Sequence, residues 1–229
     1  MDAETGTSSY RYIIQRVTLL FVFAVILFVA AGTVRWLRGW IWVTYTLFLE
    51  TSTLIILAKR APETLKQRGM WHVDVKTFDK AFMVCWLVLA LIAPVIAGLD
   101  IRFAWSHMSM AALYCGIVFM TLVWPLATWA MVENEYFEQL LRIQTDRAHH
   151  VVTSGPYRIV RHPGYAGAIV GTLCTPLILG TLYTFIPAGA IILLFIIRTA
   201  LEDRTLRKEL DGYESYAQQT RYRLLPGIW

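Results

Sequence analysis

Residues 164–197 read GYAGAIVGTLCTPLILGTLYTFIPAGAIILLFII, a stretch of 34 positions without a charged side chain. A single helix of that length would be about 50 Å long, which far exceeds the roughly 30 Å hydrocarbon core of a bilayer. Near its middle the stretch carries a cluster of helix-interrupting residues, namely Gly180, Thr181, Thr184, Pro187 and Gly189. Because glycine and proline punctuate helices, the stretch predicts a hairpin of two helices, at about residues 165–179 and 183–210.

Further uncharged runs precede this hairpin. Of the 229 residues, 57% are hydrophobic and 16% are charged, whereas a soluble domain carries about a quarter charged residues. The uncharged runs are 17–34, 81–99 and 103–132, and a fourth run, 39–58, is interrupted by Glu50. A helical crossing needs about twenty apolar residues. We therefore predict an all-α fold, a polytopic integral membrane helical bundle with four full spans plus a C-terminal two-helix hairpin.

The distribution of basic residues predicts the orientation in the membrane. Lysine and arginine gather in residues 59–80, in residues 142–161 and in the tail after residue 197. Cytoplasmic loops accumulate these residues near span ends, so we expect the three segments and both termini on the cytosolic side. Arg35 and Arg38, in the first connection, run against this trend. The first apolar run lacks the cleavage pattern of a signal peptide, and we expect it to remain as a helix.

The chain divides into two regions by its polarity. Residues 1–132 are expected to hold the four spans, and residues 133–229 to hold a polar loop, the hairpin and a polar tail. The loop and the tail flank the hairpin on one side of the membrane, so their side chains should meet at one membrane face. Glu50 is expected to be either a functional residue or the partner of a hydroxyl or a histidine on a neighbouring helix.

Some classes of function are disfavoured by the same sequence. No G-x-G-x-x-G motif lies between a strand pattern and a helix pattern, so a soluble-type nucleotide-binding domain is not expected. A net charge of +5 in a membrane protein does not indicate nucleic acid as a partner. The histidines of the polar loop lack the spacing and the cysteines of a zinc site, and no metal site is predicted.

The polar loop holds the densest group of chemically capable side chains. Residues 149–165 read HHVVTSGPYRIVRHPGY, with three histidines, two tyrosines and a Gly-Pro turn. His162 precedes Pro163, which favours extended backbone at the histidine and suits the first turn of a helix. The free N–H groups of such a helix start can bind a carboxylate. The alternative interpretation is a positively charged loop with aromatic anchors at the membrane interface.

A second group lies where the last apolar helix reaches the tail. Arg198 and Glu202 are spaced i, i+4 and share one helical face. Glu202 could accept hydrogen bonds from ammonium or hydroxyl groups, and the planar guanidinium of Arg198 suits a carboxylate. The alternative interpretation is an ordinary ion pair within one helix.

The order of these motifs resembles that of a known family. The sequence carries, in turn, Gln144, the pattern H-x-V-V-T-S-G-x-Y at 149–157, R-H-P-x-Y at 161–165, the predicted hairpin, R-x3-E at 198–202 and Y-x2-Y at 213–216. This order resembles the isoprenylcysteine carboxyl methyltransferase family, which is related to membrane phospholipid methyltransferases. The resemblance covers about residues 144–226, while the first four predicted spans resemble the family only in being apolar.

The resemblance implies a function and a set of site residues. It implies an S-adenosyl-L-methionine-dependent O-methyltransferase that acts on the carboxylate of a lipid-like, isoprenylcysteine-type acceptor. Arg198 would face that carboxylate, and the acceptor would enter from the bilayer among membrane lipids, with no obligate protein partner inferred. The cofactor would be bound by Gln144, His149, His150, Val151, Val152, Tyr157, His162, Pro163, Gly164, Tyr165 and Glu202.

Two departures from the family pattern keep other functions open. The acidic pair Glu202-Asp203 is followed by Arg204, and the end of the chain reads RYRLLPG at 221–227, which is nearer to membrane sterol reductases. One alternative is therefore an NADPH-dependent sterol or enone reductase, and another is a phospholipid or amine N-methyltransferase with the same cofactor pocket. A transporter or scaffold would leave the R-H-P-x-Y block unexplained.

Overall fold

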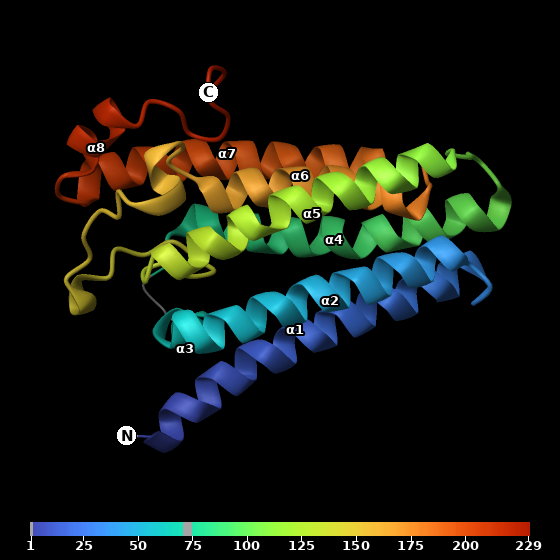
Figure 1. The fold of residues 1–229 in the computed structure, drawn as a ribbon, viewed down its shortest axis with the longest axis horizontal. Helices are drawn as coiled ribbons and strands as arrows, with labels where there is room; N and C mark the ends of the chain where they lie inside the picture. Colours follow the sequence, from blue (N-terminus) through green and yellow to red (C-terminus); the bar gives the residue numbers. More distant parts are fainter. Residues whose placement is uncertain (1, 71–74) are drawn as a thin grey trace.

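The computed structural model describes residues 2–70 and 75–229, and within these ranges every regular element is a helix, as predicted (Figure 1). The long helices are α1 (Asp2–Ala31), α2 (Leu37–Arg60), α4 (Thr77–Phe103), α5 (Met110–Glu133), α6 (Pro163–Leu179) and α7 (Phe185–Glu209). The short helices are α3 (Pro62–Arg68) and α8 (Tyr213–Gln219), with single 3₁₀ turns η1 (Thr145–Arg147) and η2 (Gly155–Arg158).

Five of the long helices, all except α6, are long and apolar enough to cross a membrane. Large apolar side chains point away from the bundle, among them Phe21, Phe48, Leu122 and Ile186, each about two-thirds exposed. Such a surface would be costly in water and is favourable in lipid. The chain is therefore an integral membrane protein, as predicted. Helix α6 has 17 residues and a length of about 25 Å, so it is shorter than a full crossing.

The predicted hairpin is confirmed, with arms at α6 and α7. Gly180 ends α6 in the left-handed region, with φ of +79°, and its N–H donates to the Pro176 carbonyl. The hydroxyls of Thr181 and Thr184 lie 2.7 Å apart and close the turn. Small residues let α5 approach α6 closely, since a Cβ on Gly116 would lie 2.8 Å from Ile178 Cγ1. Close approach through small residues is typical of helices packed in membranes.

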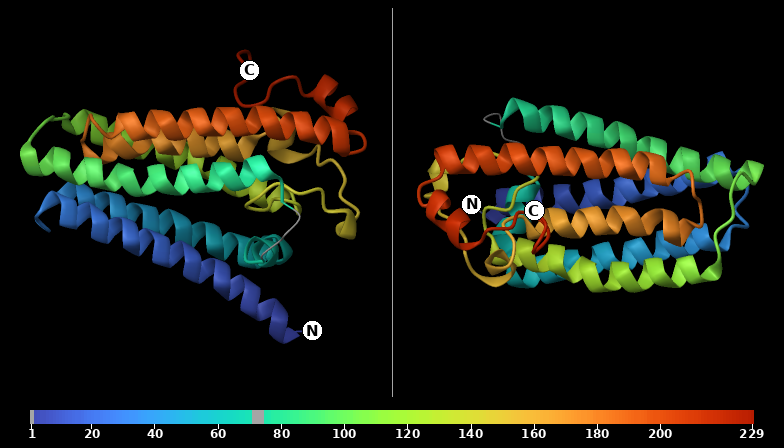
Figure 2. Two further views of the ribbon diagram at one scale, coloured as in Figure 1. Left: turned by 180° about the vertical axis from the view of Figure 1, so that it is seen from behind. Right: turned by 90° about the horizontal axis from the view of Figure 1, so that it is seen from above.

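The polar segments gather at one end of the bundle, which we call the site end. The loop 134–162, helix α3 and helix α8 lie at this end, and the N-terminus lies on the same side (Figures 1 and 2). The short connections α1–α2, α4–α5 and α6–α7 lie at the opposite end. The three basic segments of the sequence therefore share one end of the bundle.

Two charged residues within or beside the spans have structural partners. The guanidinium of Arg16 in α1 donates to the carboxylate of Glu50 in α2, with Nε 3.2 Å from Oε2. The prediction of a hydroxyl or histidine partner for Glu50 is wrong, because α1 begins well before the predicted span and brings Arg16 into the helix pair. At the opposite end, Arg38 donates to the carbonyls of Met108 and Ser109, at 3.0 and 2.8 Å. Arg38 thus ties the start of α2 to the connection between α4 and α5, which explains its place outside the basic end.

Candidate functional site

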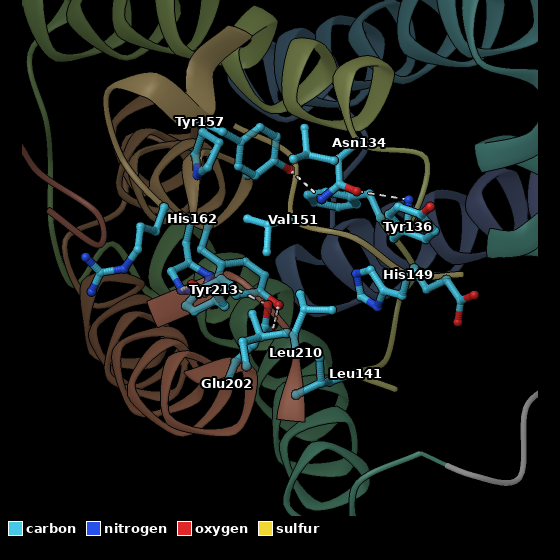
Figure 3. Close-up of a pocket in the computed structure, with 18 of the residues that line it drawn as sticks. Asn134, Tyr136, Leu141, His149, Val151, Tyr157, His162, Glu202, Leu210 and Tyr213 are labelled. Atoms are coloured by element: carbon cyan, nitrogen blue, oxygen red, sulfur yellow. Dashed lines mark hydrogen bonds and ion pairs between the residues drawn. The ribbon is translucent and has the colours of Figure 1, made fainter. Parts of the chain in front are cut away.

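A pocket opens at the site end of the bundle between the loop 134–162 and helices α6, α7 and α8 (Figure 3). Its free space is about 770 Å³, including the open mouth. The predicted site residues that line it are His149, His150, Val151, Val152, Tyr157, His162, Pro163, Gly164, Tyr165, Arg198 and Glu202. Every predicted site residue except Gln144 is therefore brought to one cavity.

Gln144 is buried behind the loop and does not line the pocket. Its side-chain amide donates to the Tyr136 carbonyl at 3.0 Å, and its Oε1 accepts from Arg147 at 2.6 Å. Its backbone N–H lies 3.3 Å from His149 Nδ1 and donates to it. Gln144 therefore stabilises the loop conformation and orients His149 from behind the cavity wall, without lining the cavity itself.

Tyr136 also lines the pocket, although no sequence motif predicted it. Its ring packs against His149 with centroids 4.3 Å apart, and its hydroxyl lies 2.8 Å from His150 Nδ1. Burial, together with the nearby charges of His150 and Arg147, lowers the pKa of His149 to about 4. The imidazole of His149 is therefore uncharged at pH 7 and forms an aromatic part of the pocket wall.

The Gly-Pro turn places Tyr157 deep in the wall. Gly155 has φ of +55°, and a Cβ there would lie 2.8 Å from Glu133 Cδ, so this position requires glycine. The Tyr157 hydroxyl donates to the Ala130 carbonyl at 3.3 Å and accepts from Asn134 at 3.2 Å. These bonds anchor the loop to the end of α5.

The start of α6 forms the floor of the pocket. Pro163 is the first residue of the helix, as predicted from the sequence, and His162 precedes it. A Cβ on Gly164 would lie 2.6 Å from Phe137 Cζ, so glycine allows the loop to close over the helix start. The rings of His162 and Tyr165 are parallel at 5.6 Å, and the Tyr165 hydroxyl donates to Glu202 at 2.6 Å. This hydrogen bond joins α6 to α7 inside the cavity.

Arg198 lies in the same cavity but already has a carboxylate partner, Asp79 of α4. Arg198 Nη2 donates to Asp79 Oδ2 at 2.9 Å and to the Gln139 carbonyl at 2.8 Å, and Nε lies 2.7 Å from Oδ1 within ion-pair distance. The backbone N–H of Leu141 also donates to Asp79. The guanidinium packs over the rings of Phe82 and Tyr165, at 4.4 and 5.0 Å from their centroids. Asp79 thus holds both Arg198 and the loop at the pocket mouth.

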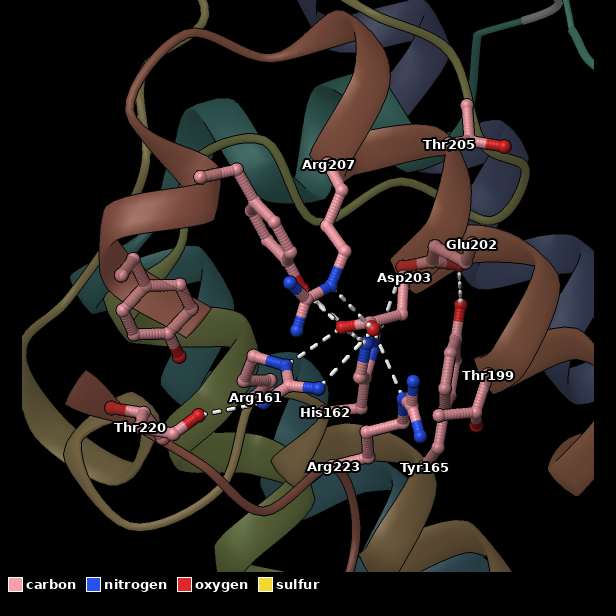
Figure 4. Close-up of polar contacts among 12 residues, drawn as sticks. Arg161, His162, Tyr165, Thr199, Glu202, Asp203, Thr205, Arg207, Thr220 and Arg223 are labelled. Carbon is pink, nitrogen blue, oxygen red and sulfur yellow. Dashed lines mark hydrogen bonds and ion pairs between the residues drawn. The ribbon is translucent and has the colours of Figure 1, made fainter. Parts of the chain in front are cut away.

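Asp203, next to Glu202, is the centre of a buried ionic cluster (Figure 4). Its side chain is fully buried and accepts from Arg161 at 2.7 and 3.1 Å, from Arg223 at 3.0 Å and from Arg207 at 3.2 Å. The Tyr213 hydroxyl donates to the same carboxylate at 3.1 Å. Of these partners, Arg207 alone is at a spacing that the sequence could reveal, i+4 from Asp203 in the same helix, while Arg161, Tyr213 and Arg223 lie in other segments.

The C-terminal tail is pinned to the start of α6 by the same cluster. The backbone N–H groups of Arg161 and His162 donate to the carbonyls of Tyr222 and Arg223, both at 2.9 Å. Arg161 Nη1 donates to the carbonyls of Thr220 and Arg221. The tail therefore crosses behind the pocket as an ordered strap, and it fixes the backbone on which His162 lies.

Glu202 shares the cavity wall with one other carboxylate, Glu138, which is paired with Arg142 at 3.1 Å. The oxygens of Glu202 lie 3.6 Å from His162 Nδ1 and 3.9 Å from Arg198 Nε. Burial alone would lower the pKa of His162, but its contacts with Asp203 and Glu202 outweigh burial and raise the pKa above 6.5. The site can therefore complement a cationic ligand group at Glu202 and surround it with aromatic rings.

Fold and site together define a polytopic helical membrane protein with a ligand pocket at one membrane face. Residues 102–208 match the sequence model of the isoprenylcysteine carboxyl methyltransferase (ICMT) family. This part of the chain is similar to that family, in agreement with the resemblance that the order of motifs indicated. The match starts earlier than predicted, because it includes α5, and it ends before the tail with its Tyr-x2-Tyr motif.

Two similar proteins carry names that agree with the family. Each is called "Probable protein-S-isoprenylcysteine O-methyltransferase", one from Oryza sativa subsp. indica and one from Oryza sativa subsp. japonica. Each is 26% identical to this chain over 109 residues, which are 46% of this chain and 57% of the relative. The match thus spans little more than half the length of these relatives.

Replacement of Asp203 by alanine is predicted to destabilise the protein by about 3–5 kcal/mol, because it leaves the buried guanidinium of Arg161 without its carboxylate. Thermal and denaturant unfolding of the purified protein would measure this loss. Asp211→Ala is the control, since Asp211 is an exposed acidic residue just beyond α7. Equal stability of the two variants would contradict the central role of Asp203.

Two of the three histidines that line the pocket, His149 and His162, are predicted to have pKa values shifted in opposite directions. Histidine NMR should give a pKa near 4 for His149 and a pKa above 6.5 for His162, with His149→Gln and His162→Gln used for assignment. Since the pKa of His162 is raised by folding, its stabilisation of the fold is complete below pH 6.5 and is lost as the pH rises through the raised value. A His162 signal that titrates below 6.5 would refute the described contacts with Glu202 and Asp203.

Proposed function

We propose that this protein is an S-adenosyl-L-methionine-dependent membrane methyltransferase that acts on the carboxylate of a lipid-like, isoprenylcysteine-type acceptor. The observation that carries this proposal is the convergence of the R-H-P-x-Y block and the Arg198-x3-Glu202 pair on one pocket at a membrane face. Much of this pocket is built by residues within the matched family region. The names of the rice relatives support the same reaction.

The pocket residues suit a sulfonium nucleotide. Glu202 would hold the ammonium or hydroxyl groups, and the first turn of α6 would hold a carboxylate through the backbone N–H of Gly164, since Pro163 has no N–H and the N–H of Tyr165 donates to the His162 carbonyl. The aromatic rings of Tyr136, His149 and Tyr157 would enclose the apolar and planar parts. When bound, the cofactor supplies an electrophilic methyl group. These residues hold it and exclude water, and Gln144 supports the wall from behind.

Arg198 would align the acceptor rather than neutralise it. A carboxylate acceptor arrives ionised, so no general base is required, and much of the acceleration comes from positioning. An arginine free of other partners would bind the acceptor oxygen tightly and lower its nucleophilicity. The ion pair with Asp79 partly compensates the positive charge of Arg198, while the remaining N–H groups of the Arg198 guanidinium stay at the pocket wall.

One observation also favours a second acceptor class, a phospholipid amine. Because Asp79 balances the charge of Arg198, the arginine repels a cationic amine less than a free arginine would. An amine must lose a proton before or during transfer, and His162 and Glu202, 3.6 Å apart, are the candidate bases.

The acceptor is proposed to enter sideways from the bilayer, because a lipid-tailed molecule and a water-soluble cofactor can meet only at the membrane face. The site end carries the three basic segments, and by the distribution of basic residues we place it, with both termini, in the cytosol.

Calorimetric titration with S-adenosylhomocysteine and with NADPH tests the cofactor. Glu202→Gln is predicted to bind S-adenosylhomocysteine at least about tenfold more weakly, since it loses a charge-assisted hydrogen bond. Glu209→Gln, in the same helix but on the exposed surface beside Lys76, should bind as the unaltered protein does. Unchanged binding by Glu202→Gln would refute the pocket assignment, and tight binding of NADPH alone would refute the methyltransferase.

Transfer of labelled methyl groups to a prenylated cysteine and to phosphatidylethanolamine tests the acceptor. Arg198→Lys is predicted to reduce methylation of the prenylated cysteine at least about tenfold with unchanged S-adenosylhomocysteine affinity, because lysine lacks the planar guanidinium. If only phosphatidylethanolamine is methylated, the amine is the acceptor and the carboxyl proposal is wrong.

A further inference from the structure

After α8 the chain turns back toward the membrane. Figures 1 and 2 show α8 at the extreme of the site end, whereas the C-terminus lies beside α7, set back along the bundle. The backbone N–H groups of Arg161 and His162 donate to the carbonyls of Tyr222 and Arg223, so this part of the tail lies beside the residues that lead into α6. The tail therefore follows the flank of the bundle at the level where α6 begins.

That level lies at the boundary of the hydrocarbon core. Residues 164–197 carry no charge, and α6, about 25 Å long, is shorter than a core of roughly 30 Å. Tyr165, in the first turn of α6, is bonded to Glu202 of α7. Glu209, the last residue of α7, lies about 10 Å further from the bilayer than Glu202. The tail is therefore level with the lipid headgroups, while the end of α7 extends beyond them.

The last residues of the tail, 223–229, form an ordered unit that we call the C-terminal turn. The Trp229 carbonyl accepts from the N–H groups of Arg223 and Leu224, both at 2.9 Å. The Arg223 guanidinium packs over the Trp229 ring, 4.9 Å from its centroid, and its Nε donates to Asp203 at 3.0 Å. The C-terminal turn is therefore fixed to the buried Asp203 cluster.

The C-terminal turn presents two large apolar side chains to the outside. Leu224 points inward and is buried, whereas Leu225 and Ile228 are 49% and 78% exposed. The value for Ile228 is the highest among the large apolar side chains of the described residues. A single exposed apolar residue is ordinary, but an ordered turn that holds two of them at the level of the headgroups is suited to insertion into lipid.

Exposed arginines flank the same surface. Arg221 lies in the tail just before the C-terminal turn, and Arg158 lies just before the segment to which the tail is bonded. Neither side chain has an ion-pair partner among the described residues. No acidic residue occurs in 147–201 or in 215–229. Such a surface complements the phosphate groups of anionic lipids.

We propose that the C-terminal turn is a membrane anchor, which inserts Leu225 and Ile228 into the leaflet at the site end while Arg158 and Arg221 bind the phosphates of anionic phospholipids. Because the neighbouring carbonyls of Tyr222 and Arg223 hold the backbone of residues 161–162, the inserted turn sets the depth of the pocket floor in the membrane. The lipid leaflet is the occupant of this surface, since the spans place it at the membrane face. This anchor does not depend on the reaction proposed above.

Depth-dependent fluorescence quenching tests the insertion. Nitrobenzoxadiazole is attached to Ile228→Cys, and separately to Leu225→Cys, in protein with Cys85→Ala and Cys115→Ala, while the buried Cys174 is kept. In nanodiscs of phosphatidylcholine and phosphatidylglycerol, both labels should emit at shorter wavelength than in water and should lose intensity when lipids carry a nitroxide near the ester end of a chain.

Asp211→Cys is the matched control, because Asp211 is exposed beyond the end of α7, and its label should remain in water. Equally weak quenching at positions 211, 225 and 228 would overturn the insertion. Quenching of the label by a nitroxide on a second copy of the protein, and not by the lipid, would assign the surface to a dimer and would also overturn the proposal.

The role of the arginines is tested with the same label at position 228. A nitroxide lipid with a phosphatidylglycerol headgroup should quench it more than one with a phosphatidylcholine headgroup. Arg158→Gln combined with Arg221→Gln should lower this ratio at least about fivefold, the effect expected of one arginine near an anionic surface. Lys59→Gln with Arg60→Gln, at the end of α2 on the far side of the bundle, should leave it unchanged. An equal ratio in both double variants would overturn the binding of anionic headgroups.

Discussion

The buried carboxylate of Asp203 holds together parts of the chain that are otherwise far apart. A fully buried ion is unfavourable unless cations and hydrogen-bond donors surround it, and here Arg161, Arg207, Arg223 and Tyr213 do so. These partners come from the loop before α6, from α7 itself and from the tail. Their requirement for one shared anion draws the two polar segments on either side of the hairpin into a single body, and the pocket is the space that this body leaves open.

A second buried pair, Arg198 with Asp79, performs a similar task on the other side of the cavity. It links α7 to α4 and, through Gln139 and Leu141, to the loop at the pocket mouth. Neither aspartate lines the pocket, whereas Glu202 does, together with Glu138, which is paired with Arg142. The aspartates are held by buried arginines at 2.7 Å, whereas the nearest guanidinium nitrogen to Glu202 is 3.9 Å away and its closer partners are Tyr165 and His162.

The fold was largely predictable because a bilayer penalises charge so strongly that uncharged runs mark the helices, and because Gly180 and its neighbours mark the turn. The site was predictable where its residues are contiguous, as at 149–165, or one helical turn apart, as at Arg198 and Glu202. The role of Asp79 was not predicted, because it is 119 positions from Arg198 and a pairing over that distance produces no recognisable spacing in the sequence. Gln144 was predicted to line the pocket from its place in the motif, but its side chain turns away from the cavity.

Helix α6, which starts at the pocket floor, spans about 25 Å and is shorter than the hydrocarbon layer around it. Membranes adjust to short helices by thinning locally or by drawing polar flanks inward. At this place the layer of headgroups would therefore sink toward the hairpin, and the pocket mouth would lie below the general membrane surface. Lipid composition sets the thickness of the bilayer, and a thicker bilayer would resist the depression that the short helix imposes. The depth of the pocket mouth below the membrane surface would therefore depend on lipid composition.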